Sequence, residues 1–320
     1  MQRTSSVSLN DSKMLDVNVI LCTYNRSQSL AKALESVAAS VLPASINWEV
    51  MVVDNNSHDQ TREVVETFSR RYPGRFRYVF ERQQGKSYAL NRAIRETRAD
   101  ILAFMDDDVI VEPTWLQNLT AGLHGGIWVG AGGRIVPDWP CSPPSWLPVK
   151  EWYGMAPLVM FDLGLEAGRL QDAPFGTNMA FHRSMFEKYG PFRTDLGPRP
   201  NSEIRSEDTE FGNRLLAAGE PIRYEPRAVV HHAVPQKRLQ KKFFLRWWFD
   251  KGRTDIRENR RMKDKLVLGV PLVFLRKVTV GTFRWVLAIQ PARRFSYRLT
   301  VWFLAGKIVE SFRRSAQPSL

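Results

Sequence analysis

Three consecutive aspartates, Asp106, Asp107 and Asp108, directly follow the apolar run Ile101–Met105. Carboxylates at the end of a buried strand are costly unless a positive charge lies among them. A hard divalent cation with oxygen ligands meets that need, and Mg²⁺ or Mn²⁺ bridging phosphates is its usual form. The alternative is a helix N-cap or a solvated turn, because Asp is common in both. On the triplet alone, the two interpretations are equally good.

Two more polar clusters end apolar runs of the chain. The run Val17–Cys22 is followed by Thr23–Arg26, and the run Val50–Val53 is followed by Asp54–Ser57. Ligands of a parallel sheet bind beyond the carboxyl ends of its strands. Together with the aspartates, three polar clusters each follow an apolar run. The three together indicate one ligand site more firmly than any single cluster does.

The elements expected to hold these clusters are short apolar runs that alternate with helical patterns. Strands are expected over 17–22, 50–53, 76–80 and 101–105, and helices over 29–41, 59–72 and 86–98. This alternation predicts an α/β fold in which helices cover both faces of a mostly parallel sheet. Residues 136–148 contain five prolines and two tryptophans, which favours a loop or lid over a regular element.

Seven short motifs occur in a fixed order along the chain. They are Thr23–Arg26, Asp54, Gly85–Asn91, Asp106–Asp108, Gly176–Phe181, Phe192–Arg193 and Ser206–Phe211. In this order they resemble the inverting nucleotide-sugar glycosyltransferases of glycosyltransferase family 2, which have the Rossmann-like GT-A fold. The resemblance covers about residues 17–232, and the ordered set is specific although each motif alone is weak.

The resemblance implies a site for a nucleotide-sugar donor. Its residues would be Thr23, Tyr24, Arg26, Asp54, Lys86, Asn91, Asp106 and Asp107. Tyr24 and Arg26 would lie around the nucleotide, and Asp54 would bond the base or the ribose. Lys86 and Asn91 would lie near the ribose or the phosphates.

The resemblance also implies a metal, Mn²⁺ or Mg²⁺, that bridges the diphosphate. Asp108 would ligate it, and Asp106 would contact either the metal or the ribose. His231 and His232 follow an apolar pair, and one of them, with His232 favoured, would complete the metal site or touch the diphosphate. The alternative is a strand-end histidine with a structural hydrogen bond.

Asp208 is implied as the catalytic base, and Glu207 as a residue that helps to position the acceptor. The physical logic agrees, because inverting transfer is a direct displacement at the anomeric carbon. It needs a base on the acceptor hydroxyl and charge stabilisation on the departing diphosphate. The alternative for Glu207 and Asp208 is a charged pair at the start of a helix.

The acceptor side is expected around Gly176, Thr177 and Asn178, with Trp139 and Trp146 as surfaces on which a sugar ring could stack. A packing role explains the two tryptophans equally well. The expected reaction moves a sugar from a nucleotide donor, with a UDP-sugar favoured, to a hydroxyl of a growing glycan or a lipid-linked acceptor.

The positive charge of the chain is concentrated in residues 235–320. This region has 21 Lys and Arg against 5 Asp and Glu, whereas the rest of the chain has 25 against 28. The asymmetry indicates a localised anionic partner. Residues 236–261 interleave cations with Phe and Trp, which suits an anionic membrane surface. Nucleic acid and a helical subdomain with a solvated basic face are the alternatives.

A peripheral position on the cytoplasmic face of the inner membrane is expected. The apolar run Leu266–Leu275 is too short to span a bilayer, which needs about 20 apolar residues. Residues 1–16 are expected to be a disordered tail without a secretion signal. Residues 17–234 would form the GT-A domain, with a nucleotide-binding half, 17–135, and an acceptor-binding half, 136–234. Residues 235–320 would be a basic, amphipathic helical region associated with the membrane.

Composition excludes several classes of protein. The chain has 320 residues, of which 43% are hydrophobic and 25% charged, so it is neither disordered nor collagen-like nor a coiled coil. Its two cysteines, Cys22 and Cys141, exclude a disulfide scaffold and a Cys-rich zinc site.

Two other functions compete with the transferase. A basic nucleic-acid-binding protein is disfavoured because the excess charge is confined to residues 235–320. A nucleotidyltransferase on a similar sheet would have a glycine-rich phosphate loop near the first strand, and residues 23–30 contain no glycine.

Overall fold

The computed structural model describes residues 14–149, 152–199, 205–258, 266–267 and 269–316. Its first half contains the expected alternation of strands and helices. The elements are β1 (Leu15–Thr23), α1 (Ser27–Ala38), β2 (Ile46–Asp54), α2 (Thr61–Arg71), β3 (Phe76–Phe80), α3 (Lys86–Glu96) and β4 (Ile101–Asp106). β1 begins within the segment expected to be a tail, and residues 1–13 of that tail lie outside the described residues.

The second half is less regular, as the prolines of residues 136–148 predict. Its elements are β5 (Val109–Val111), α4 (Trp115–Ala121), β6 (Gly130–Asp138), the 3₁₀ helix η1 (Trp152–Leu158), β7 (Gly168–Arg169), β8 (Asn178–His182), α5 (Arg183–Tyr189), α6 (Glu207–Ala217) and β9 (Ile222–Ala233). The C-terminal region follows. It consists of η2 (Gln236–Arg238), α7 (Lys241–Glu258), the short strands β10 (Leu266–Val267) and β11 (Val270–Pro271), α8 (Leu272–Leu287) and α9 (Pro291–Ala316).

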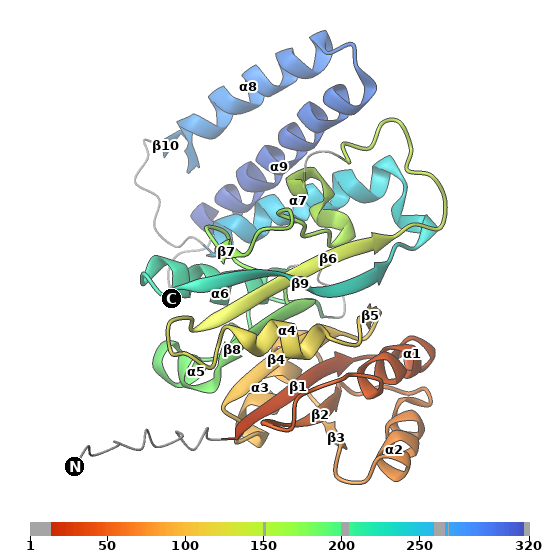
Figure 1. The fold of residues 1–320 in the computed structure, drawn as a ribbon. Coiled ribbons are helices and arrows are strands. Elements are labelled where there is room, and N and C mark those ends of the chain that lie inside the picture. Colours follow the sequence, from red (N-terminus) through yellow and green to blue (C-terminus); the bar gives the residue numbers. More distant parts are fainter. Residues whose placement is uncertain (1–13, 150–151, 200–204, 259–265, 268, 317–320) are drawn as a thin grey trace, which may run out of the picture.

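One mixed sheet organises the molecule, in the order β3-β2-β1-β4-β8-β6-β9-β5 (Figure 1). The first four strands are parallel, so the expected α/β fold with a mostly parallel sheet is confirmed. Thr23 at the end of β1 pairs with Asp54 at the end of β2, and its neighbour Cys22 pairs with Asp106 at the end of β4. The three polar clusters therefore lie at one edge of the sheet.

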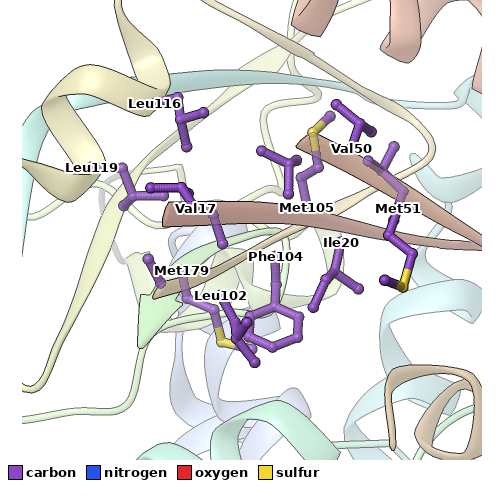
Figure 2. Close-up of a cluster of buried hydrophobic side chains, with 14 of the residues drawn as sticks. Val17, Ile20, Val50, Met51, Leu102, Phe104, Met105, Leu116, Leu119 and Met179 are labelled. Carbon is purple, nitrogen blue, oxygen red and sulfur yellow. The ribbon is translucent and has the colours of Figure 1, made fainter. Parts of the chain in front are cut away.

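The core of this half is built from the apolar strands. Figure 2 shows Leu116 and Leu119 of α4 on one side of β1, while Leu102 and Phe104 of β4 point to the other side. All four side chains are buried. Burial of both faces explains why these strands are near-continuous apolar runs rather than alternating patterns.

The second half of the sheet brings a distant strand to the aspartates. β5 begins directly after Asp108 and pairs antiparallel with β9, with Val109 opposite His232. β9 also runs parallel to β6, with a register shift between Gly133 and Arg134. A residue more than 120 positions away in the chain is thus held beside the triplet by strand register alone.

The C-terminal helices pack on the rest of the protein. A second apolar cluster joins Leu147 and Leu158 to Phe244 and Trp248 of α7 and to Phe295 of α9. These helices lie at the end of the molecule opposite to α2 and β3 (Figure 1). Among the helices that the structure describes, none is long and apolar enough to cross a membrane.

Two glycines allow α7 and α9 to cross closely. A Cβ on Gly252 of α7 would overlap the carbonyl group of Phe303, and a Cβ on Gly306 of α9 would overlap the carbonyl group of Phe249. In both cases the obstacle is backbone of the other helix, which cannot move aside as a flexible side chain could. The crossing therefore depends on the absence of a side chain at both positions.

Gly306→Ala is expected to lower the thermal unfolding temperature, because overpacking typically costs about 1–3 kcal/mol. Ala is the better helix former by about 1 kcal/mol, so a net loss of stability would report the clash directly. Gly125→Ala is the control, since a Cβ there meets nothing within 4 Å. A Gly306→Ala protein as stable as the parent would show that the two helices do not cross as closely as described.

Candidate active site

The strand-end aspartates are held by residues of the first loop. Thr23 Oγ1 donates a hydrogen bond of 2.6 Å to Asp107, and Arg26 Nη1 lies 2.9 Å from Asp107 and 2.8 Å from Asp108. Burial raises the pKa of Asp107 to about 6, although the charge of Arg26 opposes this rise. Asp107 is thus a buried anchor for the loop, while the Arg26 side chain, 45% exposed, closes over the triplet.

Asp106 has different partners, on the other side of the site. Lys86 Nζ at the start of α3 and Thr177 Oγ1 each donate a 2.6 Å hydrogen bond to its carboxylate. Burial alone would oppose ionisation of Asp106, but the Lys86 charge and these hydrogen bonds lower its pKa to about 2. Lys86 Nζ also lies 3.8 Å from Oε1 of Glu207. One half-buried cation, Lys86, therefore connects Asp106 with the acidic pair.

The structure shows a fit for a divalent metal beside Asp108. Asp108 Oδ1 and His232 Nε2 are 3.7 Å apart, a separation that one ion at ordinary ligand distances of about 2.1 Å can bridge. His232 is buried, and burial lowers its pKa, which favours the neutral imidazole that ligates metals. His231 instead faces Glu112, with 3.3 Å between Nε2 and Oε1. His232 therefore lies beside the aspartates, whereas His231 lies beside Glu112.

The protein offers few ligands to such an ion. No group of three or more His, Cys, Asp or Glu side chains suited to a metal occurs in the part of the chain that the structure describes. Mg²⁺ and Mn²⁺ in phosphate-handling enzymes are often held by one or two carboxylates together with water and the phosphates of the substrate. With so few protein ligands, a metal here would need water or substrate phosphates to complete its coordination.

The acidic pair lies at the start of α6. Asp208 Oδ2 accepts a 2.6 Å hydrogen bond from the backbone N–H of Gly176. A Cβ on Gly176 would lie 2.8 Å from that oxygen, so only glycine allows this approach. Glu207 is buried, and burial together with the Asp208 charge raises its pKa to about 7 against the opposing charge of Lys86. The preceding Ser206 has a left-handed backbone, with φ of 78°, which is strained for a residue other than glycine.

A pocket of about 260 Å³ opens onto these carboxylates. Its lining includes Asp106, Thr177, Glu207 and Asp208, and its opposite wall comes from α7. That wall consists of Trp247, Trp248 and Lys251. Asp106 at the end of β4 and the acidic pair thus share one cavity.

The residues of α7 were not expected at the site. Their region was assigned to a membrane surface because its cations and aromatic residues alternate, and no local signal marks which side of the helix faces inward. Lys251 Nζ donates a 2.9 Å hydrogen bond to Ser206 Oγ, directly before the acidic pair. α7 therefore supports the pocket as well as lining it.

Several expected site residues are fully engaged in structural bonds. Asp54 accepts hydrogen bonds of 2.8 Å from the Ser57 N–H and from the Tyr78 hydroxyl. The Asn91 amide bonds both the N–H and the C=O of Phe192, at 2.9 and 2.8 Å. A role for Asp54 and Asn91 at the nucleotide stays a prediction.

The residues expected on the acceptor side are dispersed. Asn178 is completely buried, where it accepts from the Trp115 indole and donates to the C=O groups of Arg134 and Ala228. The Trp146 ring lies 4.7 Å from that of Phe295 and packs in the second apolar cluster.

Trp139 packs against the same cluster as Trp146. Gly176 and Thr177 remain beside the carboxylates. Sugar stacking on Trp139 or Trp146 is not indicated by their packed positions and stays a prediction.

Tyr24 is 41% exposed on the loop after β1, where its ring is free to contact a ligand.

Comparison with known proteins identifies the family of this chain. The model of the family "Glycosyl transferase family 2" matches residues 18–190. Glucosyl-dolichyl phosphate glucuronosyltransferase of Haloferax volcanii is 26% identical over 71% of this chain and 72% of its own. Succinoglycan biosynthesis protein ExoM of Rhizobium meliloti is 28% identical over 75% and 74%.

Solved structures have the same fold. Mannosyltransferase PcManGT from Pyrobaculum calidifontis, in complex with GDP-Man and Mn²⁺, superposes with a TM-score of 0.56 at 20% identity, over 95% of this chain and 76% of its own. GalNAc-T7 with UDP, GalNAc and Mn²⁺ has a TM-score of 0.56 at 15% identity, over 75% and 48%. The fold is GT-A with a helical C-terminal extension. The family match covers more than half of the chain, and the protein belongs to glycosyltransferase family 2 and is a glycosyltransferase.

Proposed function

We propose that the protein is a metal-dependent, inverting glycosyltransferase. It moves a sugar from a nucleotide-sugar, with a UDP-sugar as the favoured donor, to a hydroxyl of a glycan or a lipid-linked acceptor. The observation that carries this proposal is the shared pocket, which is lined by Asp106 from the donor half and by Asp208 from the acidic pair. A donor at the strand ends and an acceptor against α7 would meet there.

Each residue of the site has a separate role in the proposed reaction. Asp208 accepts the proton of the acceptor hydroxyl as that oxygen attacks the anomeric carbon. Glu207 holds Lys86, and Lys86 holds Asp106 in the ionised form. Asp108 and His232 are the residues that would hold Mn²⁺ or Mg²⁺, which neutralises charge on the departing diphosphate when bound. Arg26, now paired with the aspartates, is placed to move onto that diphosphate.

The relatives support the choice of substrates. The name of the Haloferax relative describes transfer to a lipid-linked sugar, and that of the Rhizobium relative describes synthesis of a polysaccharide. The two structural neighbours contain GDP-Man and UDP, each with Mn²⁺. We therefore propose a role in cell-surface polysaccharide or glycoconjugate synthesis, with the protein attached peripherally to the cytoplasmic face of the membrane through residues 235–320.

Thermal unfolding with UDP, GDP, dTDP and CMP, each with and without Mn²⁺, tests the donor. We expect UDP with Mn²⁺ to raise the unfolding temperature most, because a ligand at about a hundred times its Kd adds about 2.7 kcal/mol to stability. UDP without the metal should give a much smaller shift, since the protein alone offers few metal ligands. A larger shift with another nucleotide would change the donor, and no shift with any of them would contradict the proposal.

A further inference from the structure

The outer face of α8 is an unpartnered apolar surface. Leu272, Leu275, Val280, Phe283, Val286 and Leu287 are all exposed, and their spacing places them on one side of the helix. Phe283, Val286 and Leu287 are each more than 60% exposed, and Ile289 beyond the helix is 94% exposed. Arg276 and Thr279 are exposed on the same side, so the face is largely but not wholly apolar. Exposed apolar surface of this kind marks an interaction site.

The orientation of α8 is set by its opposite face. Phe274 is buried in a cluster with Leu304 of α9. Gly281 approaches Val301, and the Trp285 ring lies 6.2 Å from that of Trp302. In Figure 1, α8 lies on the outside of α9, at the end of the molecule farthest from β1–β3. The exposed face is therefore directed outward by packing and is not a loose helix end.

A basic groove lies between α7 and α9. It has a volume of about 560 Å³, and its described lining contains cations and apolar residues without an acidic side chain. These residues are Lys241, Lys242, Leu245, Arg246, Phe249, Arg298 and Trp302. Such a lining complements a phosphate that is attached to an apolar group.

Arg298 connects the groove with α8. Its guanidinium carbon lies 5.2 Å from the ring centre of Trp285 on α8 and 5.1 Å from that of Trp302 on α9. Its Nε is buried and has no hydrogen-bond partner among the described residues. Arg298 itself lines the groove, so its guanidinium can meet a phosphate held there.

We propose that α8 and this groove form a docking face for a bilayer that contains anionic phospholipid. The apolar face of α8 enters the boundary between headgroups and acyl chains, and the groove holds a lipid phosphate. The 16 residues of α8 extend about 24 Å, less than the roughly 30 Å of a hydrocarbon core, so the helix lies in the interface. Arg276, Lys277 and Arg284 on α8 are exposed and supply further cations for the headgroups.

Docking of this kind would set the position of the catalytic pocket. One side of α7 lines the groove through Leu245 and Phe249, and another side lines the pocket through Trp247 and Lys251. The pocket would be held close to the membrane, where a lipid-linked acceptor is confined. The docking face specifies the membrane attachment of the proposed function, and the position of the acceptor rests on that function.

Sedimentation with vesicles tests the docking face in the full-length protein. We expect binding to phosphatidylcholine vesicles that contain phosphatidylglycerol and little binding to pure phosphatidylcholine. The double variant Phe283→Glu, Val286→Glu should bind the anionic vesicles at least about tenfold more weakly, because two charges replace apolar surface at the interface. Arg298→Gln should weaken binding to anionic vesicles alone.

The matched control is the double variant Ile127→Glu, Leu165→Glu. It makes the same kind of change at two apolar side chains that are as exposed as those of α8 but lie elsewhere, and it should bind vesicles like the parent. Unchanged vesicle binding by the α8 variant would overturn the proposal. The proposal would also be overturned if the parent formed a dimer that did not bind vesicles and the α8 variant were a monomer. The exposed face of α8 would then join two copies of the chain.

The nucleotide-dependent thermal shift separates this proposal from the proposed function. An α8 variant that keeps the UDP and Mn²⁺ shift but loses vesicle binding supports the docking face and shows that the donor site is folded. A parent protein that binds vesicles but shows no nucleotide shift leaves the docking face in place and contradicts the proposed donor and metal.

Discussion

Asp208→Asn is expected to lower sugar transfer by about 10²–10⁴-fold while donor binding remains, because general-base catalysis contributes about this much and the amide cannot accept the proton. The contacts proposed for the donor lie at the strand ends, where Lys86 bonds Asp106, and do not include Asp208, which bonds Gly176. Initial rates of transfer, together with the nucleotide-dependent thermal shift, measure the two effects separately.

The control for Asp208→Asn is Asp172→Asn, which removes another carboxylate that lines the same pocket. Asp172 is exposed, and its loss should change the rate little. Thermal unfolding of the Asp208→Asn protein is also required, since Asp208 accepts hydrogen bonds from Gly176 and Thr209. Equal loss of transfer and of donor binding, or an equal loss in Asp172→Asn, would contradict the assignment of the base.

His232→Ala and Asp108→Ala are each expected to remove the Mn²⁺-dependent part of the UDP thermal shift, and with it nearly all transfer. The two side chains are 3.7 Å apart and are the pair that the structure offers to a metal. Nucleotide binding without metal should persist in weakened form, because neither change removes Lys86 or the contacts of Thr23 and Arg26 with Asp107. Titration of Mn²⁺ against a fixed UDP concentration measures the change.

His231→Ala is the matched control, one residue away on the same strand. Its ring faces Glu112 and is 43% exposed, so its loss should leave the Mn²⁺ titration unchanged. If His231→Ala weakened the metal response as much as His232→Ala, the register between β5 and β9 would not explain the choice of ligand.

The arrangement of the first four strands and the polar residues that follow them could be predicted, because it depends on patterns within short stretches of sequence. Apolar runs such as Ile101–Met105 end abruptly in polar residues, and the edge of a parallel sheet brings those ends together. The choice between His231 and His232 could not be made firmly from the sequence. It depends on the pairing of β9 with β5, which places Val109 opposite His232. A shift of one residue would have turned the other histidine to the aspartates.

The wall of the pocket that α7 forms was not predicted, because the residue types of this helix suit two different locations. Its Lys, Arg, Phe and Trp residues suit both a lipid surface and the wall of a pocket, and the helix uses them for contact with the pocket through Trp247 and Lys251. Trp146 shows the converse, because an aromatic residue in a proline-rich loop suits sugar stacking yet packs against Phe295. Only tertiary packing separates these uses.

The wall that α7 contributes to the pocket has a consequence for how such enzymes diverge. The family model ends at residue 190, well before Lys241–Glu258, so the donor machinery and the far wall of the pocket belong to different segments of the chain. Substitutions at Trp247 or Lys251 would change the surface proposed to meet the acceptor without altering Asp106 or Asp108. The choice of acceptor can therefore drift in evolution while the chemistry on the nucleotide-sugar stays the same.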